Sequence, residues 1–207
     1  MIIPRADFVT SATTAAEYPE AGAPEVAFCG RSNVGKSSCL NVLAQRTHLA
    51  RVSKTPGRTR LINFFELDIL EETRSGARKA PKTIRLVDLP GYGFASGPRE
   101  DRAKWKKMID AYLSMREPLK AFVVLIDGEL GPQPSDLEMV GWSVSMGRRP
   151  IVVATKIDKV SKSRRAAALQ KHASALALPA VMPFSAKEKI GLEELWKALM
   201  KETGLAP

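Results

Sequence analysis

A run of glycine, lysine and serine has the spacing of a phosphate-binding loop. Residues Gly30–Ser37 match the pattern G-x-x-x-x-G-K-[S/T]. Gly30 and Gly35 let the main chain curl closely around phosphates, and backbone N–H groups converge there at the start of a helix. Lys36 can bridge phosphate oxygens, and the hydroxyl of Ser37 can bind magnesium. The segment therefore predicts a site for a nucleoside triphosphate.

A second short motif, Asp88–Gly91, follows an expected strand further along the chain. An aspartate at a strand end can hold magnesium through a water molecule. The N–H of Gly91 can reach the γ-phosphate. The motif D-x-x-G is common by chance, so its value lies in its position after the phosphate loop.

A third motif, Thr155–Asp158, predicts a base-binding loop. The carboxylate of Asp158 can accept hydrogen bonds from guanine N1–H and the 2-amino group, a donor pair that adenine lacks. The stem of Lys156 can lie against the base. After the last expected strand, the N–H of Ala186 next to Ser185 can reach guanine O6.

A threonine that binds magnesium and senses the γ-phosphate is expected between the first two motifs, in residues Arg51–Arg60. Thr59 is the favoured candidate, because the turn made by Pro56 and Gly57 places it at the start of a strand. Thr55 remains the alternative.

Strand-like and helix-like segments alternate along the chain, which positions these motifs. The expected strands are Glu25–Cys29, Arg60–Leu70, Thr83–Asp88, Ala121–Asp127, Ile151–Thr155 and Ala180–Ser185. The expected helices are Lys36–Ala44, Pro98–Met115, Ser135–Met146, Ser163–Leu176 and Leu192–Lys201. This order predicts a three-layer α/β fold: a mixed, mostly parallel six-stranded sheet with helices on both faces. The loops after the parallel strands then meet along one edge.

Details of single elements give sharper expectations. Ser135 and Glu138 fit a capping box, and Leu137, Val140 and Val144 predict the inner face of that helix. Polar residues 71–82, centred on Ser75 and Gly76, predict a hairpin turn between two antiparallel strands.

Two regions are expected along the chain. Residues 1–24 lack clear periodicity and form an N-terminal extension, in which Asp7–Thr10 can add a short strand. Residues 25–207 form the nucleotide-binding domain. The first residues contain no apolar signal-peptide core, and no apolar run approaches the ~20 residues of a membrane helix, so we expect a cytoplasmic protein without a membrane span.

The composition of the chain indicates which kinds of partner it favours. The chain has 207 residues, a formal net charge of +10 and a pI near 9.8, which favours polyanionic partners such as RNA. Cys29 and Cys39 form no CxxC pair, and we expect both to be small buried side chains. Oligomeric state is open, with a monomer as the default.

Together the segments GRSNVGKS, KTPGRTR, DLPGYG, TKID and SAK resemble the EngB (YihA/YsxC) GTPases, in the translation-factor-related class that includes Era. The resemblance covers Glu25 to the C-terminus. It implies a P-loop, Ras-like G domain that binds GTP or GDP with Mg²⁺ and hydrolyses GTP slowly as a molecular switch. It further implies a role in assembly of the large ribosomal subunit, through ribosomal RNA, and an older association with cell division and septation.

On this basis we assign roles to individual residues. The catalytic residues are Lys36, Thr59 and Gly91, and the magnesium ligands are Ser37, Thr59 and Asp88. The predicted nucleotide contacts are Gly30, Arg31, Ser32, Asn33, Val34, Gly35, Lys36, Ser37, Ser38, Gly57, Arg58, Thr59, Arg60, Leu61, Asp88, Leu89, Pro90, Gly91, Thr155, Lys156, Ile157, Asp158, Phe184, Ser185 and Ala186.

Two positions depart from the general GTPase pattern. Thr155 replaces the usual asparagine, and Tyr92 stands where Ras-like proteins place the glutamine that orients the attacking water. A potassium ion at Asn33, which matches the potassium-binding asparagine of similar GTPases, is one hypothesis for the missing function. An arginine finger from Arg58 or Arg60 is the other.

Basic residues predict a partner surface, and other functions remain open. Residues 99–107 and Lys162–Arg165 are rich in lysine and arginine, which suits RNA but also an ordinary solvated helix face. A metabolic P-loop kinase is the rival enzyme class. A GTP-dependent RNA- or ribosome-binding module with negligible turnover is the rival without catalysis.

Overall fold

The computed structural model describes residues 1–50, 61–70, 80–92 and 99–206, the side chains of residues 99–102 and 104 excepted. Within these residues the sheet has seven strands. In spatial order they are β1 (Ile2–Ala12), β3 (Ile62–Leu70), β4 (Lys82–Asp88), β2 (Glu25–Gly30), β5 (Leu119–Asp127), β6 (Ile151–Thr155) and β7 (Met182–Pro183). β3 pairs antiparallel with β1 and β4, and the pairs from β4 through β2, β5 and β6 to β7 are parallel.

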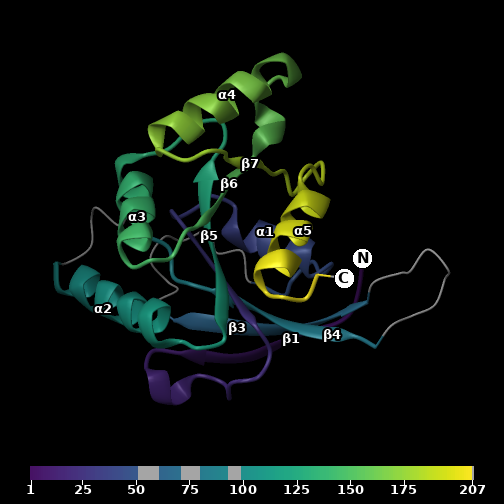
Figure 1. Cartoon of the computed structure of the whole chain (residues 1–207), viewed down its shortest axis with the longest axis vertical. Coiled ribbons are helices and arrows are strands. Elements are labelled where there is room, and N and C mark those ends of the chain that lie inside the picture. The colour runs from purple at the N-terminus through teal and green to yellow at the C-terminus, as the bar shows by residue number, and fades with distance from the viewer. Residues whose placement is uncertain (51–60, 71–79, 93–98, 207) are drawn as a thin grey trace.

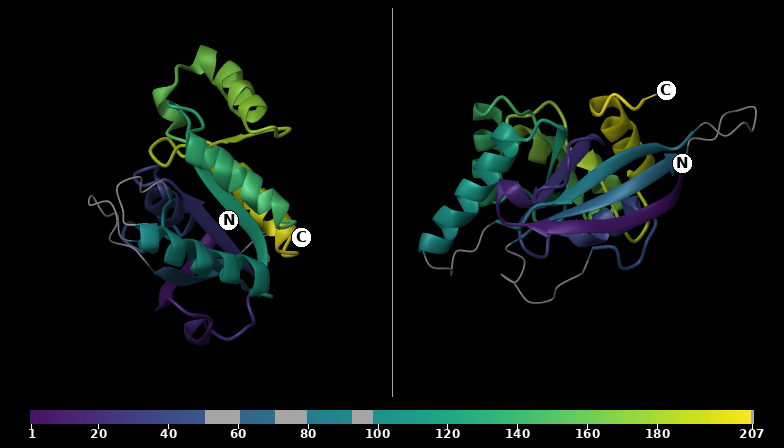
Figure 2. Two further views of the ribbon diagram at one scale, coloured as in Figure 1. Left: turned by 90° about the vertical axis from the view of Figure 1, so that its left-hand side faces the viewer. Right: turned by 90° about the horizontal axis from the view of Figure 1, so that it is seen from below.

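Helices cover both faces of the sheet (Figure 1). They are α1 (Lys36–Leu43), α2 (Arg99–Met115), α3 (Pro134–Ser145), α4 (Lys162–Ala175) and α5 (Leu192–Glu202), with 3-10 turns η1 (Ala15–Glu17) and η2 (Ile157–Lys159). α1 and α5 pack on one face, while α2, α3 and α4 lie on the other (Figure 2). The predicted three-layer α/β fold is confirmed.

The buried strands supply both cores through their alternation. In β2, Val26 and Phe28 face the core under α1 and α5, whereas Ala27 and Cys29 face the core under α2 and α3. Successive side chains of a strand point to opposite faces, so a continuous apolar run fits a strand covered on both sides. Cys29 and Cys39 are free and buried, as expected, and burial raises the pKa of both thiols.

The sheet has one strand more than the predicted six, because the N-terminal residues pair with it. Asp7–Thr10 was expected as a short strand, but β1 extends over Ile2–Ala12 and pairs with β3 along its length. Most β1 side chains are exposed at the sheet edge, so the sequence carries little hydrophobic periodicity there. The predicted boundary between an N-terminal extension, residues 1–24, and the nucleotide-binding domain therefore stays a prediction. Part of that extension, β1, belongs to the sheet of the domain.

The start of α3 was predicted wrongly, and of the three residues predicted for its inner face Val140 is buried while the other two are exposed. The helix begins at Pro134, and the N–H of Gln133 donates to Asp136, so the expected Ser135–Glu138 box is not the cap. Leu137 and Val144 are 42% and 47% exposed, and the buried residues of α3 are Asp136, Met139, Val140 and Ser143. A buried aspartate breaks the apolar pattern from which the face was predicted.

The remaining element boundaries differ by small amounts. β7 is shorter than the predicted Ala180–Ser185 and covers Met182–Pro183, although the N–H of Phe184 still donates to the Ala154 carbonyl oxygen of β6 at 2.8 Å. β3 and β4 form the predicted antiparallel hairpin, and its turn at Ser75 and Gly76 lies outside the described residues.

Candidate nucleotide-binding site

The predicted phosphate loop joins β2 to α1. Gly35 is the N-cap of α1 and has a φ of 105°, a conformation that only glycine adopts without strain. Asn33 is also in the left-handed region, with φ 62°, and is exposed. Ser37 and Ser38 lie half-buried in the first turn of α1. The backbone N–H groups at this helix start are not all used within the helix, which suits an anion.

The lysine of this loop pairs with the aspartate of the second motif. Lys36 Nζ and Asp88 Oδ1 form an ion pair in which the side chains are 12% and 8% exposed. Asp88 ends β4, where its register partner in β2 is Phe28, so neighbouring strands bring the two loops together. Asn63 on β3 lies 3.5 Å from the other Asp88 oxygen and accepts a hydrogen bond from Ser11 Oγ at 2.6 Å.

The loop after Asp88 lies directly against the phosphate loop. A Cβ added to Gly91 would lie 3.1 Å from the carbonyl oxygen of Gly30 and 3.5 Å from the amide nitrogen of Ser32. The next residue, Tyr92, donates its N–H to the same Gly30 oxygen at 3.2 Å. Leu89 and Pro90 are buried beneath the loop. Glycine is therefore the residue that permits this close approach.

Thr155 connects the third motif to the phosphate loop. Its hydroxyl lies 2.6 Å from the Val34 carbonyl oxygen and 2.9 Å from that of Ile126. A hydroxyl has a single proton, so it donates to one of these oxygens at a time. Thr155 is 3% exposed. Where the sequence left the role of this threonine open, the structure assigns it a bond that links β6 to the phosphate loop.

Lys156 is held by an aspartate that the sequence motifs did not include. Its Nζ lies 2.8 Å from Oδ2 of Asp127, the last residue of β5. Burial acts to raise the pKa of Asp127, but hydrogen bonds from Lys156 and from the N–H groups of Leu130 and Glu129 bring it below its ordinary value. Asp127 therefore carries a negative charge at neutral pH.

Asp158 is oriented by the last motif. Ser185 Oγ donates to Asp158 Oδ1 at 2.6 Å and accepts the N–H of Glu188 at 3.0 Å. Phe184 is buried, and its carbonyl oxygen accepts the N–H of Ile157 at 3.2 Å. Ala186 follows, half-buried. The predicted base-binding residues are thus brought together from two successive loops.

Part of the predicted site lies outside the described residues, namely Gly57, Arg58, Thr59 and Arg60, and the alternative Thr55. Leu61 lies just inside them and is 38% exposed. Of the phosphate loop, Ser32 is exposed and Arg31 is half-buried.

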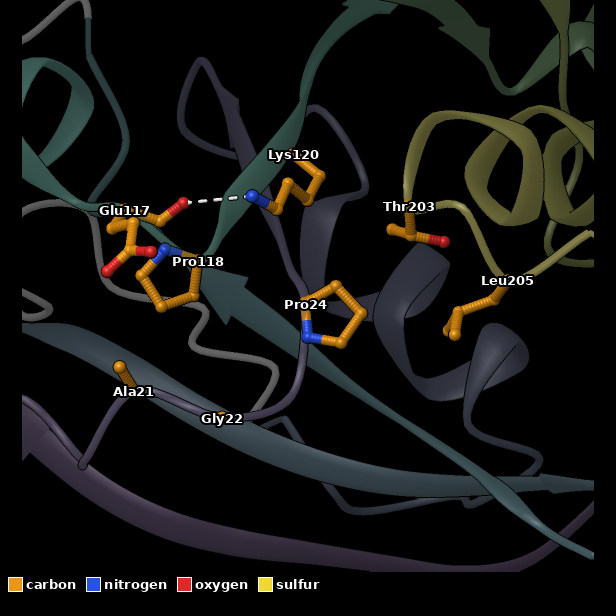
Figure 3. Close-up of a pocket in the computed structure, with 8 residues that line it drawn as sticks. All are labelled: Ala21, Gly22, Pro24, Glu117, Pro118, Lys120, Thr203 and Leu205. Atoms are coloured by element: carbon orange, nitrogen blue, oxygen red, sulfur yellow. Dashed lines mark hydrogen bonds between the residues drawn. The ribbon is translucent and has the colours of Figure 1, made fainter.

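A pocket of about 280 Å³ lies elsewhere, among residues before β2, at the junction of α2 and β5, at the start of β5, and after α5 (Figure 3). Pro24, Pro118 and Leu205 are among its lining residues. It lies at the starting ends of β2 and β5, opposite the edge where the motif loops meet. No predicted site residue within the described ranges lines it.

Comparison with known proteins places the arrangement in a family. Residues 25–156 match the family described as 50S ribosome-binding GTPase. The probable GTP-binding protein EngB of Myxococcus xanthus is 47% identical over 201 residues, covering 96% of this chain and 95% of that protein. The chain belongs to the EngB family of GTPases. The probable EngB protein of Pelotomaculum thermopropionicum is 44% identical over 209 residues, covering 100% of this chain and 99% of that protein.

Solved structures agree with the EngB assignment. A crystal structure of a probable GTP-binding protein EngB has a TM-score of 0.63 and 25% identity, covering 87% of this chain and 98% of that one. Era, solved with MgGDPNP and nucleotides 1506–1542 of 16S ribosomal RNA, has a TM-score of 0.63 and 26% identity, covering 87% and 56%. The chain is therefore a GTPase, and the alternative of a metabolic kinase is wrong.

Three residues that contact the candidate site or the residue after it, Asp127, Asn63 and Asp136, were not singled out from sequence. Asp127 had a usable signal, because it ends a buried apolar strand in the same way as Asp88. Asn63 and Asp136 had none, since an amide inside a strand and an aspartate inside a helix are ordinary in sequence. Their contacts to Asp88 and Tyr92 arise only from packing.

Proposed function

We propose that this EngB-family chain is a GTP-dependent switch that holds one guanine nucleotide across the loops at Gly30–Ser37, Asp88–Gly91 and Thr155–Asp158. The observation that carries the proposal is the Thr155 hydroxyl, 2.6 Å from the Val34 carbonyl oxygen. This contact brings the loop for the base next to the loop for the phosphates, so that one molecule can touch both.

At the phosphate end, Lys36 is the proposed ligand of the β- and γ-phosphates. An ammonium group has three donors, so Lys36 can keep Asp88 as a neighbour while it donates to phosphate oxygens. The N–H of Gly91 is the proposed γ-phosphate contact. Its position against Gly30 and Ser32 supports that role.

The residues at this end also fit magnesium. Ser37 and Asp88 offer hydroxyl and carboxylate oxygens, the donor type that magnesium prefers. Thr59 is the proposed switch ligand, and Thr55 is the alternative. When bound, the ion would offset the negative charge that develops on the phosphates.

At the base end, Asp158 is the proposed determinant of guanine. Ser185 donates to one of its oxygens and so orients the carboxylate. We expect Asp158→Asn to shift the preference from GTP to XTP, because an amide can donate where xanthine presents an oxygen. Asp7→Asn, at a carboxylate that is 62% exposed on β1, is the matched control. A variant that still prefers GTP would contradict the proposed base contact.

Turnover is proposed to be slow without a partner. Tyr92 lacks the amide that orients water in Ras-like proteins, and its hydroxyl is bonded to Asp136. Potassium at Asn33, whose amide oxygen is a suitable donor, is the proposed aid; an arginine finger from Arg58 or Arg60 is the alternative. Equal turnover in sodium and potassium would reject the first idea, and an unaffected Arg58→Ala variant would remove that arginine.

The proposed partner is the large ribosomal subunit, with a role in its assembly and, through it, in normal cell division and septation. The family description and the net charge of +10 support this proposal. Lys106 and Lys107 are exposed on α2, and Lys162, Arg164 and Lys171 on α4. We further propose a cytoplasmic monomer. None of the helices in the described ranges has the length and apolar character that crossing a bilayer requires.

The test is pelleting with large subunits in the presence of a GTP analogue, GDP or no nucleotide, at several salt concentrations. We expect pelleting with the GTP analogue that weakens as salt rises. Replacing Lys106 and Lys107 by glutamate should reduce it, whereas Lys201→Glu on α5, on the opposite face, should not. Pelleting that ignores both nucleotide and salt would reject the proposal. Single-turnover phosphate release, with and without subunits, separates a GTPase switch from a binding module with negligible turnover.

A further inference from the structure

Tyr92 follows the proposed γ-phosphate contact Gly91 and is bonded at both of its polar ends. Its N–H donates to the Gly30 carbonyl oxygen at 3.2 Å, which gives a parallel bridge between Arg31 and Tyr92. Its phenolic O–H donates to Asp136 Oδ1 at 2.8 Å. One residue therefore connects the phosphate loop with α3.

Both partners of the side-chain bond are buried. Tyr92 is 6% exposed and Asp136 is 1% exposed. The ring lies in the core cluster that contains Cys29, Met139 and Val140. Burial raises the pKa of Tyr92, so the phenol keeps its proton and remains a donor. A phenol in this environment loses a strong partner if it moves, because water cannot replace the carboxylate.

Both carboxylate oxygens of Asp136 accept a hydrogen bond. Its Oδ2 accepts the N–H of Gln133 at 2.8 Å, at the start of α3, while Oδ1 accepts Tyr92. Burial raises the pKa of Asp136, and the hydrogen bonds from Gln133 and Tyr92 and the charge of Arg31 oppose that effect. The carboxylate thus fixes the helix start and the tyrosine together.

We propose that Tyr92 is a positioning residue, which through Asp136 holds the Gly91 N–H in place for the γ-phosphate and so sets how well the protein distinguishes GTP from GDP. This inference deepens the proposed function and rests on it. A loop that is already fixed loses little conformational freedom when the γ-phosphate binds. GDP has no γ-phosphate, so its affinity does not depend on that fixation.

The test compares Tyr92→Phe with wild type by calorimetric binding of GDPNP and of GDP. We expect the phenylalanine variant to bind GDPNP up to about tenfold more weakly, because the free energy of one hydrogen bond to a charged group is the upper limit of what the lost fixation of the loop can cost. Its affinity for GDP should stay within about twofold. Asp136→Asn should act in the same direction, because a donor-only NH2 group takes the place of one of the two oxygens that accept Gln133 N–H and Tyr92 O–H.

Tyr112→Phe is the matched control. Tyr112 donates to Glu25 at 2.8 Å, also between a buried phenol and a buried carboxylate, but at the opposite edge of the sheet. It should lower the melting temperature comparably and leave the ratio of GDPNP to GDP affinity unchanged. An unchanged ratio in Tyr92→Phe and in Asp136→Asn, or equal weakening of both nucleotides, would overturn the inference. If the wild type showed no preference for guanine nucleotides, the proposed function itself would fail.

Discussion

Charged side chains are paired at both edges of the sheet, the nucleotide edge where the motif loops meet and the opposite edge where the parallel strands begin, but the pairing differs. At the nucleotide edge, Lys36 pairs with Asp88 and Lys156 with Asp127. At the opposite edge, Glu25 is fully buried, and its two oxygens accept Tyr112 O–H at 2.8 Å and Arg116 N–H groups at 2.5 and 3.0 Å.

The difference separates structural charges from charges that are available to a ligand. The acceptor capacity of Glu25 is used within the protein, and Arg85, 3.4 Å away, adds a further cation. Arg85 and Arg116 also donate to the carbonyl oxygens of Glu20 and Pro19, so this cluster holds the chain before β2. By contrast, each lysine ammonium of the nucleotide edge has three N–H donors and a single carboxylate partner among the residues that the structure describes.

The largest expected effect comes from the opposite edge. Glu25→Ala leaves buried arginines without their carboxylate, and we expect it to lower the free energy of unfolding by about 3–5 kcal/mol. Urea denaturation measures this loss. Glu129→Ala, at a carboxylate that is 47% exposed, should change stability by less than about 1 kcal/mol. If the folded Glu25 variant lost affinity for GDP, Glu25 would not have the purely structural role that we assign to it.

The next effect in size is on binding. Lys36→Ala should weaken GTP and GDP by about 100-fold, or about 2.7 kcal/mol, because a charge-assisted contact to phosphate is lost. Isothermal calorimetry measures both affinities. Lys120→Ala, an exposed lysine at the opposite edge, should bind as wild type does. If both variants bound GTP and GDP with equal affinity, Lys36 would not be a phosphate ligand.

A smaller effect is expected at the junction of the loops. Thr155→Val keeps the shape but removes the donor to Val34 and Ile126, so we expect about 1 kcal/mol less stability and weaker binding of both GTP and GDP. Thr155→Ser keeps the hydroxyl and should resemble wild type. Valine and serine variants with the same affinity would show that the hydroxyl does not join the loops.

The smallest effect concerns the stability in acid of the outer strand pair, β1 and β3. Hydrogen bonds from Arg5 on β1 lower the pKa of Glu66 and of Asp68 on β3 from ordinary values of 4.5 and 3.8. Because these pKa values are lowered in the folded state, the carboxylates stabilise it above about pH 4.5, and this contribution is lost as the pH falls through the folded values. The urea midpoint of wild type should therefore fall more steeply between about pH 5 and about pH 3 than that of Arg5→Gln. Parallel curves would contradict the assignment.

Much of the fold could be predicted from sequence because its central strands are buried on both faces. The runs that became β5 and β6 are continuously apolar, and the phosphate motif joins a strand to a helix in local sequence. The prediction failed where burial is one-sided or polar. β1 lies exposed at the edge, and α3 buries Asp136 in place of Leu137.

The sequence by itself determined the local chemistry: a glycine-rich loop with Lys36 and Ser37, an aspartate at the end of β4, and Asp158 after β6. Spacing within one segment suffices for these, since their geometry depends on neighbouring residues. Only the tertiary structure decided that Thr155 meets Val34, that Tyr92 meets Asp136 and that Ser11 reaches Asn63. Those pairs are separated by 121, 44 and 52 residues along the chain. They meet because the sheet and helices pack together, and no local sequence pattern indicates such contacts.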